Sequence, residues 1–389
     1  MKDSAAFIVG AYEHPTRLAT DLSVAQLHAD VGLGALADAG IGIDQVDAYF
    51  CGGDAPGRGP FSVLEYMGLH VRYIDSTETG GSSYPIHVAH AADAIAAGRC
   101  DVALVTMAGR PRSRGVSVGV GQREYDLESP EVAFEAPFNP TAASLYGLCA
   151  MRHMYDFGTT SEQLAWVKVA ASVHAQHNPN ALLRSVVTVD DVLASPMIAD
   201  PLHRLDCCVV TDGGGAVVVA RREIAEALGR PLIGVIGSGQ AVKHNAGGRV
   251  DLTYSGGVES GKAAFAAAGV DQADIKYASL YDSFTITVVV QIEDLGFCEK
   301  GQGGRFVADG NLIVGVGKLP FNTDGGGLCN NHPANRGGMT KIIEAVRQLR
   351  GQAHPAVQVP NCDLALVHAT GGSLATTHAS ATLILERAQ

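Results

Sequence analysis

Two patterns of apolar residues alternate along this chain. Residues 102–106 and 363–368 are almost unbroken apolar runs, which are typical of strands in a parallel sheet covered on both faces. Residues 24–39 instead carry leucines and alanines at helical spacing and end before Gly40, as an amphipathic helix with a glycine stop does. The alternation predicts an α/β protein.

The same patterns predict further strands at residues 7–10, 46–51, 71–74, 216–219, 232–237, 277–280 and 377–385, and further helices at residues 61–70, 85–97, 141–155, 161–178, 186–195, 255–268, 285–295 and 341–351. Both parts of the chain run in the order strand, helix, apolar strand, glycine turn, helix, strand. We therefore expect two duplicated βαβ halves, at residues 1–231 and 232–389, with the site loops at strand ends. A polar stretch at residues 109–137 begins a loop or lid excursion of the first half that extends to about residue 200.

One stretch of the second half, residues 319–333, carries candidate chemistry and reads LPFNTDGGGLCNNHP. Its three glycines let the backbone approach a ligand closely. Pro333 biases His332 towards an extended or turn conformation, and a helix is expected to begin after it, in residues 334–343. His332, with Asn331 beside it, is therefore a site candidate, although a capped turn in which the imidazole only satisfies hydrogen bonds fits the same pattern.

A second candidate lies at residues 75–84, DSTETGGSSY, which open the helix expected at residues 85–97. Glycines and hydroxyls at a helix N-terminus leave N–H groups free to bind an anion or an oxyanion. Gly81 and Ser82 are the candidates here, and a serine N-cap after a turn is the structural alternative. Gly371 and Gly372, after the strand at residues 363–368, are candidate oxyanion donors of the same kind.

Charge and cysteine content narrow the classes of function. The chain has 40 acidic against 28 basic residues and no basic run, which argues against nucleic acid as a partner. No stretch of about 18 apolar residues predicts a membrane span, and the N-terminus does not resemble a signal peptide. The eight cysteines are scattered and form no C-x-x-C pair, so we expect no metal site and reduced thiols in the cytoplasm.

Several blocks, in the same order, resemble the thiolase superfamily in its sterol-carrier-protein thiolase branch. The blocks are Asn178-Pro179-Asn180-Ala181, Pro201-Leu202, Asp206-Cys207-Cys208, Asp212-Gly213-Gly214-Gly215-Ala216 and, within residues 319–333, LPFNTDGG followed by NHP. The resemblance covers nearly the whole chain. The resemblance implies the thiolase fold, in which two duplicated halves give an α-β-α-β-α layered core, and a coenzyme A thioester as substrate.

Most of the groups that carry thiolase chemistry are absent. The nucleophilic cysteine that the family places at the start of the long helix falls at Gly81, and neither Ser82 nor Ser83 has an evident base to activate it. The branch's HDCF block reads Tyr281-Asp282-Ser283-Phe284, so a tyrosine replaces its oxyanion histidine and a serine replaces its second catalytic cysteine. His332 alone of the four usual groups is retained, so acyl transfer by the thiolase route is not expected.

A phenol and an imidazole suit carbon–carbon cleavage without an acyl-enzyme, and the chain resembles the steroid side-chain aldolases of this superfamily. The resemblance implies retro-aldol cleavage of a β-hydroxyacyl-CoA, with Tyr281 and His332 as acid and base in either order. Those aldolases are expected to carry a second tyrosine near the position of His332, and this chain departs from them there. We expect the acyl group to carry a steroid or an aromatic side chain, with the choice between the two left open, and we expect no tightly bound cofactor. The supporting and oxyanion groups would be Gly81, Ser82, Asp282, Ser283, Asn331, Gly371 and Gly372.

The resemblance also implies partners. Those aldolases work with a small zinc-ribbon/OB-fold protein, so we expect such a partner chain, a homodimer through the central sheet and hence a heterotetramer. Two alternatives stay open. One is a true thiolase or acyltransferase that uses a displaced thiol such as Cys329, which lies three residues before His332. The other is a non-catalytic acyl-CoA-binding paralogue.

Overall fold

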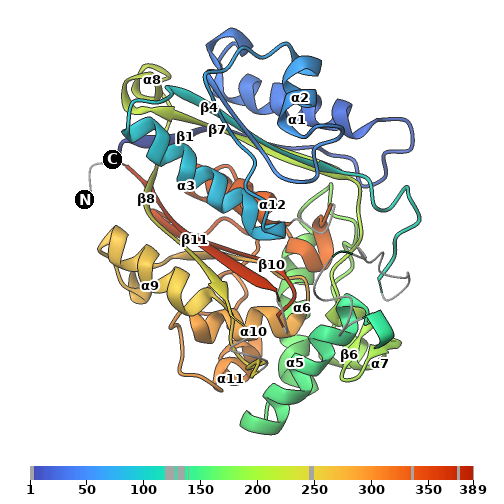
Figure 1. The fold of residues 1–389 in the computed structure, drawn as a ribbon. Coiled ribbons are helices and arrows are strands. Elements are labelled where there is room, and N and C mark those ends of the chain that lie inside the picture. The colour runs from blue at the N-terminus through green and yellow to red at the C-terminus, as the bar shows by residue number, and fades with distance from the viewer. Residues whose placement is uncertain are drawn as a thin grey trace.

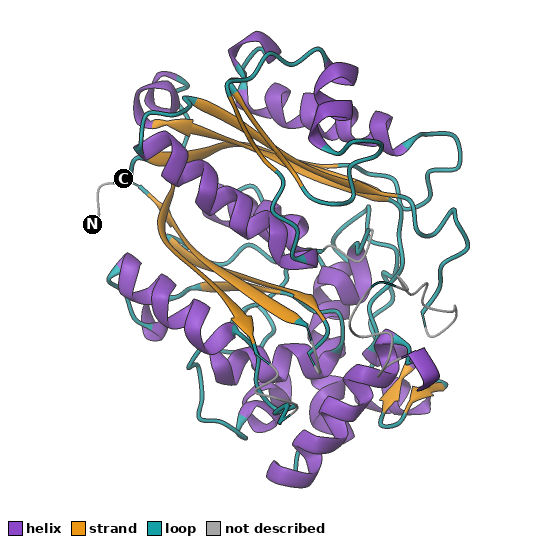
Figure 2. Ribbon diagram, viewed as in Figure 1, coloured by secondary structure: helices purple, strands orange, loops and turns teal. Residues whose placement is uncertain are grey.

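The computed structural model describes residues 4–118, 128, 136–138, 140–244, 249–333, 337–374 and 377–388. Within these ranges the strands form one nine-stranded sheet in the order β3-β2-β4-β7-β1-β8-β11-β10-β9, and a small sheet that pairs β5 with β6. Figure 1 and Figure 2 show that the long sheet bends into two halves that face each other across a layer of helices.

The strands are β1 (Ala6–Glu13), β2 (Ala48–Cys51), β3 (Tyr73–Asp75), β4 (Val102–Gly109), β5 (Met197–Ala199), β6 (Leu202–His203), β7 (Gly213–Arg221), β8 (Ile233–Lys243), β9 (Tyr277–Leu280), β10 (Leu364–Gly372) and β11 (His378–Arg387). The α-helices are α1 (Val24–Ala39), α2 (Pro60–Met67), α3 (Ser83–Ala96), α5 (Ala142–Phe157), α6 (Ser161–Ala175), α7 (Val189–Ala194), α8 (Arg222–Ala227), α9 (Gly257–Ala268), α10 (Thr285–Asp294), α11 (Gly303–Val307) and α12 (Gly338–Arg350). None of the described helices is long and apolar enough to cross a membrane.

The two halves of the sheet repeat one topology. The order β2-β4-β7-β1 in the first half corresponds to β9-β10-β11-β8 in the second, and β3 is an additional strand at the first edge. The halves are joined where β1 meets β8, at the pair formed by Phe7 and Gly234. The division of the chain between residues 231 and 232 stays a prediction, and β8 begins just after it.

Five layers follow from this arrangement, and the expected α-β-α-β-α core is confirmed. In Figure 1, α1 and α2 cover the outer face of the first half, α3 and α12 lie between the two halves, and α9 and α10 cover the outer face of the second half. Apolar side chains fill the interfaces, such as Val31 and Leu36 of α1 against the first half and Ile342 and Val346 of α12 in the central layer. Nearly all residues of α12 and most residues of α3 are buried.

The sheet is mixed, so the expectation of a parallel sheet was wrong. β4 pairs parallel with β2 but antiparallel with β7, and β10 pairs parallel with β9 but antiparallel with β11. All eight residues of β4 are buried. Burial on both faces produces an unbroken apolar run whatever the direction of the neighbouring strand, so the run could not reveal the pairing.

The excursion of the first half contains α5, α6, α7 and the small sheet, which lie together at the lower right of Figure 1. The lid expected at residues 109–137 lies mostly outside the described residues. Its described beginning is held by Asp212, whose carboxylate accepts hydrogen bonds from the N–H groups of Arg112, at 2.8 Å, and Ser113. Of the stretch at residues 334–343 in which a helix was expected to begin, residues 334–336 lie outside the described residues, and α12 begins at Gly338.

Candidate active site

A cavity of about 320 Å³ lies where β9 and β10 end, which is where ligand sites of α/β proteins gather. Six of the nine residues predicted from the sequence line it, namely Gly81, Tyr281, Ser283, His332, Gly371 and Gly372. They come from the start of α3, from the loop between β9 and α10, from the glycine-rich stretch and from the end of β10. The fold therefore brings together stretches that are far apart in the sequence.

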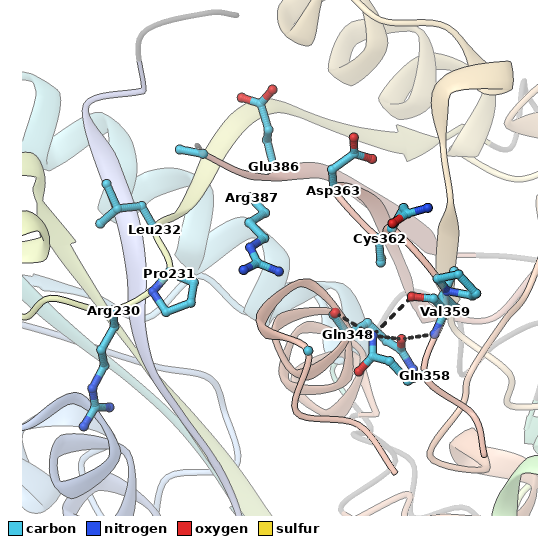
Figure 3. A pocket seen from close by; sticks show the side chains of 14 residues that line it. Arg230, Pro231, Leu232, Gln348, Gln358, Val359, Cys362, Asp363, Glu386 and Arg387 are labelled. Carbon is cyan, nitrogen blue, oxygen red and sulfur yellow. Dashed lines mark hydrogen bonds between the residues drawn. The ribbon is translucent and has the colours of Figure 1, made fainter. Parts of the chain in front are cut away.

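A larger hollow of about 820 Å³ lies at the opposite end of β10, next to the C-terminal strand β11 (Figure 3). Its wall includes Arg230, Asp363 and Arg387, and the side chains of Gln348 and Gln358, which hydrogen-bond each other at 3.0 Å. It contains none of the candidate residues. The smaller cavity at the strand ends is therefore the candidate active site.

Tyr281 and His332 form a hydrogen-bonded pair in the wall of the cavity. The Tyr281 hydroxyl and His332 Nε2 are 2.9 Å apart, and the two rings meet edge to face with centroids 5.4 Å apart. The backbone holds both residues in place. Tyr281 N–H donates to the carbonyl of His368, which continues the β9–β10 ladder, and His332 N–H donates to Thr211 Oγ1 at 2.9 Å.

Burial keeps His332 neutral. Loss of solvent lowers the pKa of His332 to about 4, and Asp282, which raises the pKa, and Lys341, which lowers it, act in opposite directions. A neutral imidazole has one nitrogen that accepts a hydrogen bond and one that donates. With Nε2 accepting from the Tyr281 hydroxyl, the pair is arranged to move a proton from the phenol to the imidazole.

Gly81 makes room for this pair. A Cβ at position 81 would lie 2.4 Å from Cε2 of Tyr281 and 2.5 Å from the carbonyl oxygen of Thr370, far inside van der Waals contact. A Cβ at Gly337 would likewise lie 2.9 Å from Cδ2 of His332. The ring of Tyr281 thus occupies the space in which a side chain at the start of α3 would have to stand.

Asp282, although predicted as a supporting group of the site, points away from the cavity. Its carboxylate forms a buried ion pair with Lys341 of α12 at 2.8 Å and accepts hydrogen bonds from the N–H groups of Gly327 and Leu328. These two residues belong to η7 (Gly326–Asn330), a short π-helix before His332. Asp282 therefore anchors the loop that carries His332.

Ser82 and Asn331 also lie outside the lining of the cavity. Ser82 Oγ donates a hydrogen bond to the carbonyl of Thr79 at 2.9 Å, and this bond closes the turn before α3. Asn331 Oδ1 accepts from Thr211 Oγ1 at 2.6 Å, and its Nδ2 donates to Glu13 at 2.9 Å. Both residues brace their loops, and neither is presented to a ligand.

Tyr146 and Cys208 line the cavity and were not predicted as site residues. Tyr146 comes from α5, stacks on Phe284 with ring centroids 4.4 Å apart and interacts with the Ser283 side chain. Burial raises the pKa of the Cys208 thiol well above its usual range, and Cys207 and Asp282 raise it further. The sequence carried no signal for Tyr146, whereas Cys208 stands in one of the blocks of the family resemblance.

Cys329, the thiol considered for an acyltransferase, does not line the cavity. It is fully buried, and its Sγ accepts a hydrogen bond from the buried Lys168 at 3.2 Å. Burial raises its pKa. Among the described residues, no group of three or more His, Cys, Asp and Glu side chains is arranged to hold a metal ion.

Fold and cavity together define an α/β protein of two layered, duplicated halves with a pocket at the strand ends. A model of the thiolase C-terminal domain-like family matches residues 239–387. The chain is 36% identical to a steroid side-chain-cleaving aldolase of Thermomonospora curvata over 84% of this chain and 85% of that protein. It is 32% identical to an acetyl-CoA acetyltransferase of Methanothermobacter thermautotrophicus over 91% of this chain and 92% of that protein.

Among solved structures, the Ltp2-ChsH2(DUF35) aldolase matches with a TM-score of 0.89 and 32% identity, covering 100% of this chain and 99% of that one. The chain therefore belongs to the thiolase superfamily. Within it, the chain resembles the sterol-carrier-protein thiolases and the steroid side-chain aldolases.

The low pKa of His332 predicts a loss of stability in acid. Unfolding exposes an imidazole with a pKa of about 6.5. Between this value and about pH 4, His332 binds a proton in the unfolded chain but not in the folded chain. The free energy of unfolding therefore falls as the pH drops through this range. His332→Gln should reduce the slope of unfolding free energy against pH, between about pH 6 and pH 5, by up to about 1.4 kcal/mol per pH unit. Urea titrations at several pH values measure it. The exposed His354→Gln is the control, and equal slopes for both variants would contradict the prediction.

The contact between Gly81 and Tyr281 predicts a coupled effect on stability. Gly81→Ala should destabilise the protein by about 1–3 kcal/mol, because the added methyl group overlaps the phenol ring. The cost should be smaller in a Tyr281→Ala background, where part of the overlap is gone. A double-mutant cycle from denaturant unfolding measures the difference, and the same cost in both backgrounds would show that the ring does not occupy this space.

Proposed function

We propose that this protein is a thiolase-like carbon–carbon lyase that cleaves a β-hydroxyacyl-CoA by a retro-aldol reaction. One observation carries the proposal: the Tyr281 ring fills the space beside Gly81, and its hydroxyl is hydrogen-bonded to a neutral His332. A proton-transfer pair thus stands where the family's nucleophilic thiol would act. The similarity to the aldolase of Thermomonospora curvata and to the Ltp2-ChsH2(DUF35) aldolase supports the proposal.

In the proposed reaction, the β-hydroxyl of the substrate gives its proton to the Tyr281 oxygen as Tyr281 passes its own proton to His332 Nε2. The Cα–Cβ bond then breaks, the β-carbon leaves as an aldehyde or ketone, and the bonding electrons form the enolate of the shorter acyl-CoA. The same proton returns through the pair to Cα. No external proton or acyl acceptor is consumed, so the reaction needs no free CoA.

Enolate stabilisation is proposed for the glycine walls of the cavity. Gly81 lies in η2 (Gly80–Ser82), the turn directly before α3, where the positive end of the helix dipole favours negative charge. Gly371 and Gly372 approach it from the end of β10. Preorganised donors of this kind stabilise a charge that develops next to them without having to reorient.

The proposed substrate is a coenzyme A thioester whose acyl part carries a steroid or an aromatic side chain. The stacked rings of Tyr146 and Phe284 give the cavity an apolar wall against which either kind of ring system can pack. The aldolase of Thermomonospora curvata is named for the cleavage of steroid side chains. No tightly bound cofactor takes part in the proposed reaction.

We also propose a small zinc-ribbon/OB-fold partner chain and a homodimer, which together give a heterotetramer. The name of the Ltp2-ChsH2(DUF35) aldolase joins two components, which favours a second chain here as well. For the homodimer, β3 lies at the edge of the large sheet and exposes Ile74. An edge strand with an exposed apolar side chain is a surface on which a second copy can pair.

An acyltransferase remains the second candidate, because the acetyl-CoA acetyltransferase of Methanothermobacter thermautotrophicus is also a relative. Cys208 favours it, since its thiol lines the cavity. The raised pKa of Cys208 weighs against it, because the thiolate is the nucleophile. Cys329 is buried away from the cavity and does not favour this candidate.

A turnover assay tests the proposed aldolase activity. With a β-hydroxyacyl-CoA that has a branched or aromatic β-substituent, and with the zinc-ribbon partner present, we expect aldehyde or ketone release without added CoA. Tyr281→Phe and His332→Ala should each lower the rate by about 10²–10⁴-fold, because each removes one half of the proton-transfer pair. Coupled assays for the carbonyl product measure it.

The exposed Tyr155→Phe and His354→Ala are matched controls and should leave this rate unchanged. Product that appears only with free CoA, and that iodoacetamide abolishes, would instead establish the acyltransferase. Tight binding of the thioester without turnover, with and without the partner chain, would establish a non-catalytic binding protein.

The homodimer is tested by placing a charge on the edge strand. Ile74→Asp should shift the protein from dimer to monomer in sedimentation velocity, because a buried unpaired carboxylate at the interface is strongly unfavourable. Val316→Asp, at another exposed apolar position, should stay dimeric. A monomeric wild-type chain, or a dimeric Ile74→Asp variant, would contradict dimerisation through β3.

A further inference from the structure

One face of the β10–β11 hairpin carries a buried row of polar side chains. His368 lies opposite Thr382, and Thr370 lies opposite Ser380. His378 lies on the same strand as Ser380, two residues before it. Directly opposite residues, and residues two apart on one strand, point to the same face of a sheet. All five are at most 1% exposed. We call His368, Thr370, His378, Ser380 and Thr382 the polar row.

Only one end of the polar row is satisfied by protein groups. Thr382 Oγ1 bonds to His368 Nδ1 at 2.8 Å and to Ser260 Oγ of α9 at 2.9 Å. His368 Nε2, Thr370 Oγ1, Ser380 Oγ and both ring nitrogens of His378 have no hydrogen-bond partner in the structure. Buried polar atoms are nearly always paired with protein or with ordered water, so five unpaired atoms on one face require an explanation.

Among the described residues, no charged group serves as the partner of the unpaired atoms of the polar row. Burial lowers the pKa of His368 and of His378 to about 3, so both rings are neutral and each has one donor and one acceptor nitrogen. The cation next to the row is Lys243, which lies opposite His378 on β8. Its ammonium group already donates to the carbonyls of Leu374, at 2.7 Å, and Asp251. The row therefore needs a neutral partner that both donates and accepts.

The row reaches the candidate active site at Thr370, in the middle of the row, and α9 covers Ser380 and His368. Thr370 lines the cavity. A Cβ at Gly256 would lie 3.2 Å from Ser380 Oγ, and one at Gly257 would lie 3.4 Å from Cε1 of His368. These two glycines let the start of α9 pack directly over the hairpin, so the helix shields His368 and Ser380 from outside.

We infer that the polar row binds a chain of ordered water molecules that is continuous with the candidate active site at Thr370. Water both donates and accepts, and a buried water typically makes about three hydrogen bonds to otherwise unsatisfied groups. The hydroxyls of Thr370 and Ser380, which are directly opposite each other, and the neutral rings of His368 and His378 offer such a set of partners. The inference does not depend on the proposed reaction.

A crystal structure of the substrate-free protein, at a resolution that shows ordered water, tests the inference directly. We expect water molecules within hydrogen-bond distance of Thr370 Oγ1, Ser380 Oγ and a ring nitrogen of His378. A row without water density, with these atoms against carbon or bonded to one another, would overturn the inference whether or not the protein proves to be an aldolase.

Thermal unfolding gives a second, independent readout. Ser380→Ala removes one partner of a bound water, so a hydrated row predicts a Tm lower by about 1–3 °C. A dry row predicts the opposite sign, because an unpaired buried hydroxyl gives way to an apolar group. Ser172→Ala is the matched control, since its hydroxyl is buried and bonded at 2.8 Å to Val169, and it should lower the Tm in either case. An increase for Ser380→Ala would overturn the inference.

Discussion

The packing of the Tyr281 ring against the backbone of Gly81 is the contact on which the candidate site depends. It joins the start of α3, from the first half of the chain, to the end of β9, from the second. On its other side, Gly81 packs closely against the start of α12, since a Cβ at Gly338 would lie 2.0 Å from the Gly81 carbonyl oxygen. Side chains at Gly81 and Gly338 would push α3, α12 and the Tyr281 loop apart. The site therefore depends on glycine at both positions, where the duplicated halves meet.

A buried ion pair positions the loop that carries His332 without entering the cavity. Asp282 and Lys341 lie 2.8 Å apart, fix η7 through the backbone N–H groups and thereby position His332. Their effects on the His332 pKa oppose each other, so burial decides the outcome and the imidazole stays neutral. Burial alone would lower the Lys341 pKa, but the neighbouring Asp282 and Asp324 hold it above its usual range. Breaking the pair by removing one partner would leave an uncompensated buried charge.

Sequence alone predicted the layered fold and six of the twelve residues that line the cavity, and its errors have physical causes. α1 was predicted with its observed ends because its helical spacing runs up to a glycine stop. Strand direction was not predictable, because a strand buried on both faces has the same apolar pattern whether its neighbours are parallel or antiparallel. Neighbours in sequence were assigned to one site, but extended backbone points successive side chains in opposite directions. Tyr281 and Ser283 therefore line the cavity, whereas Asp282 between them faces the loop, and Asn331 beside His332 faces Glu13.

Position also weighs against Cys208, the thiol in the cavity wall, as the nucleophile of a thiolase reaction. A reactive cysteine needs a lowered pKa, which a helix N-terminus or a nearby cation supplies. The helix N-terminus of this site is at Gly81, and the Tyr281 ring excludes any side chain there. Cys208 instead lies in a buried segment beside Cys207 and near Asp282, and both raise its pKa further. In the proposed function two positions therefore act together: Gly81 stands in place of the nucleophilic cysteine, and the Tyr281 ring fills the space beside it with its phenol bonded to a neutral imidazole.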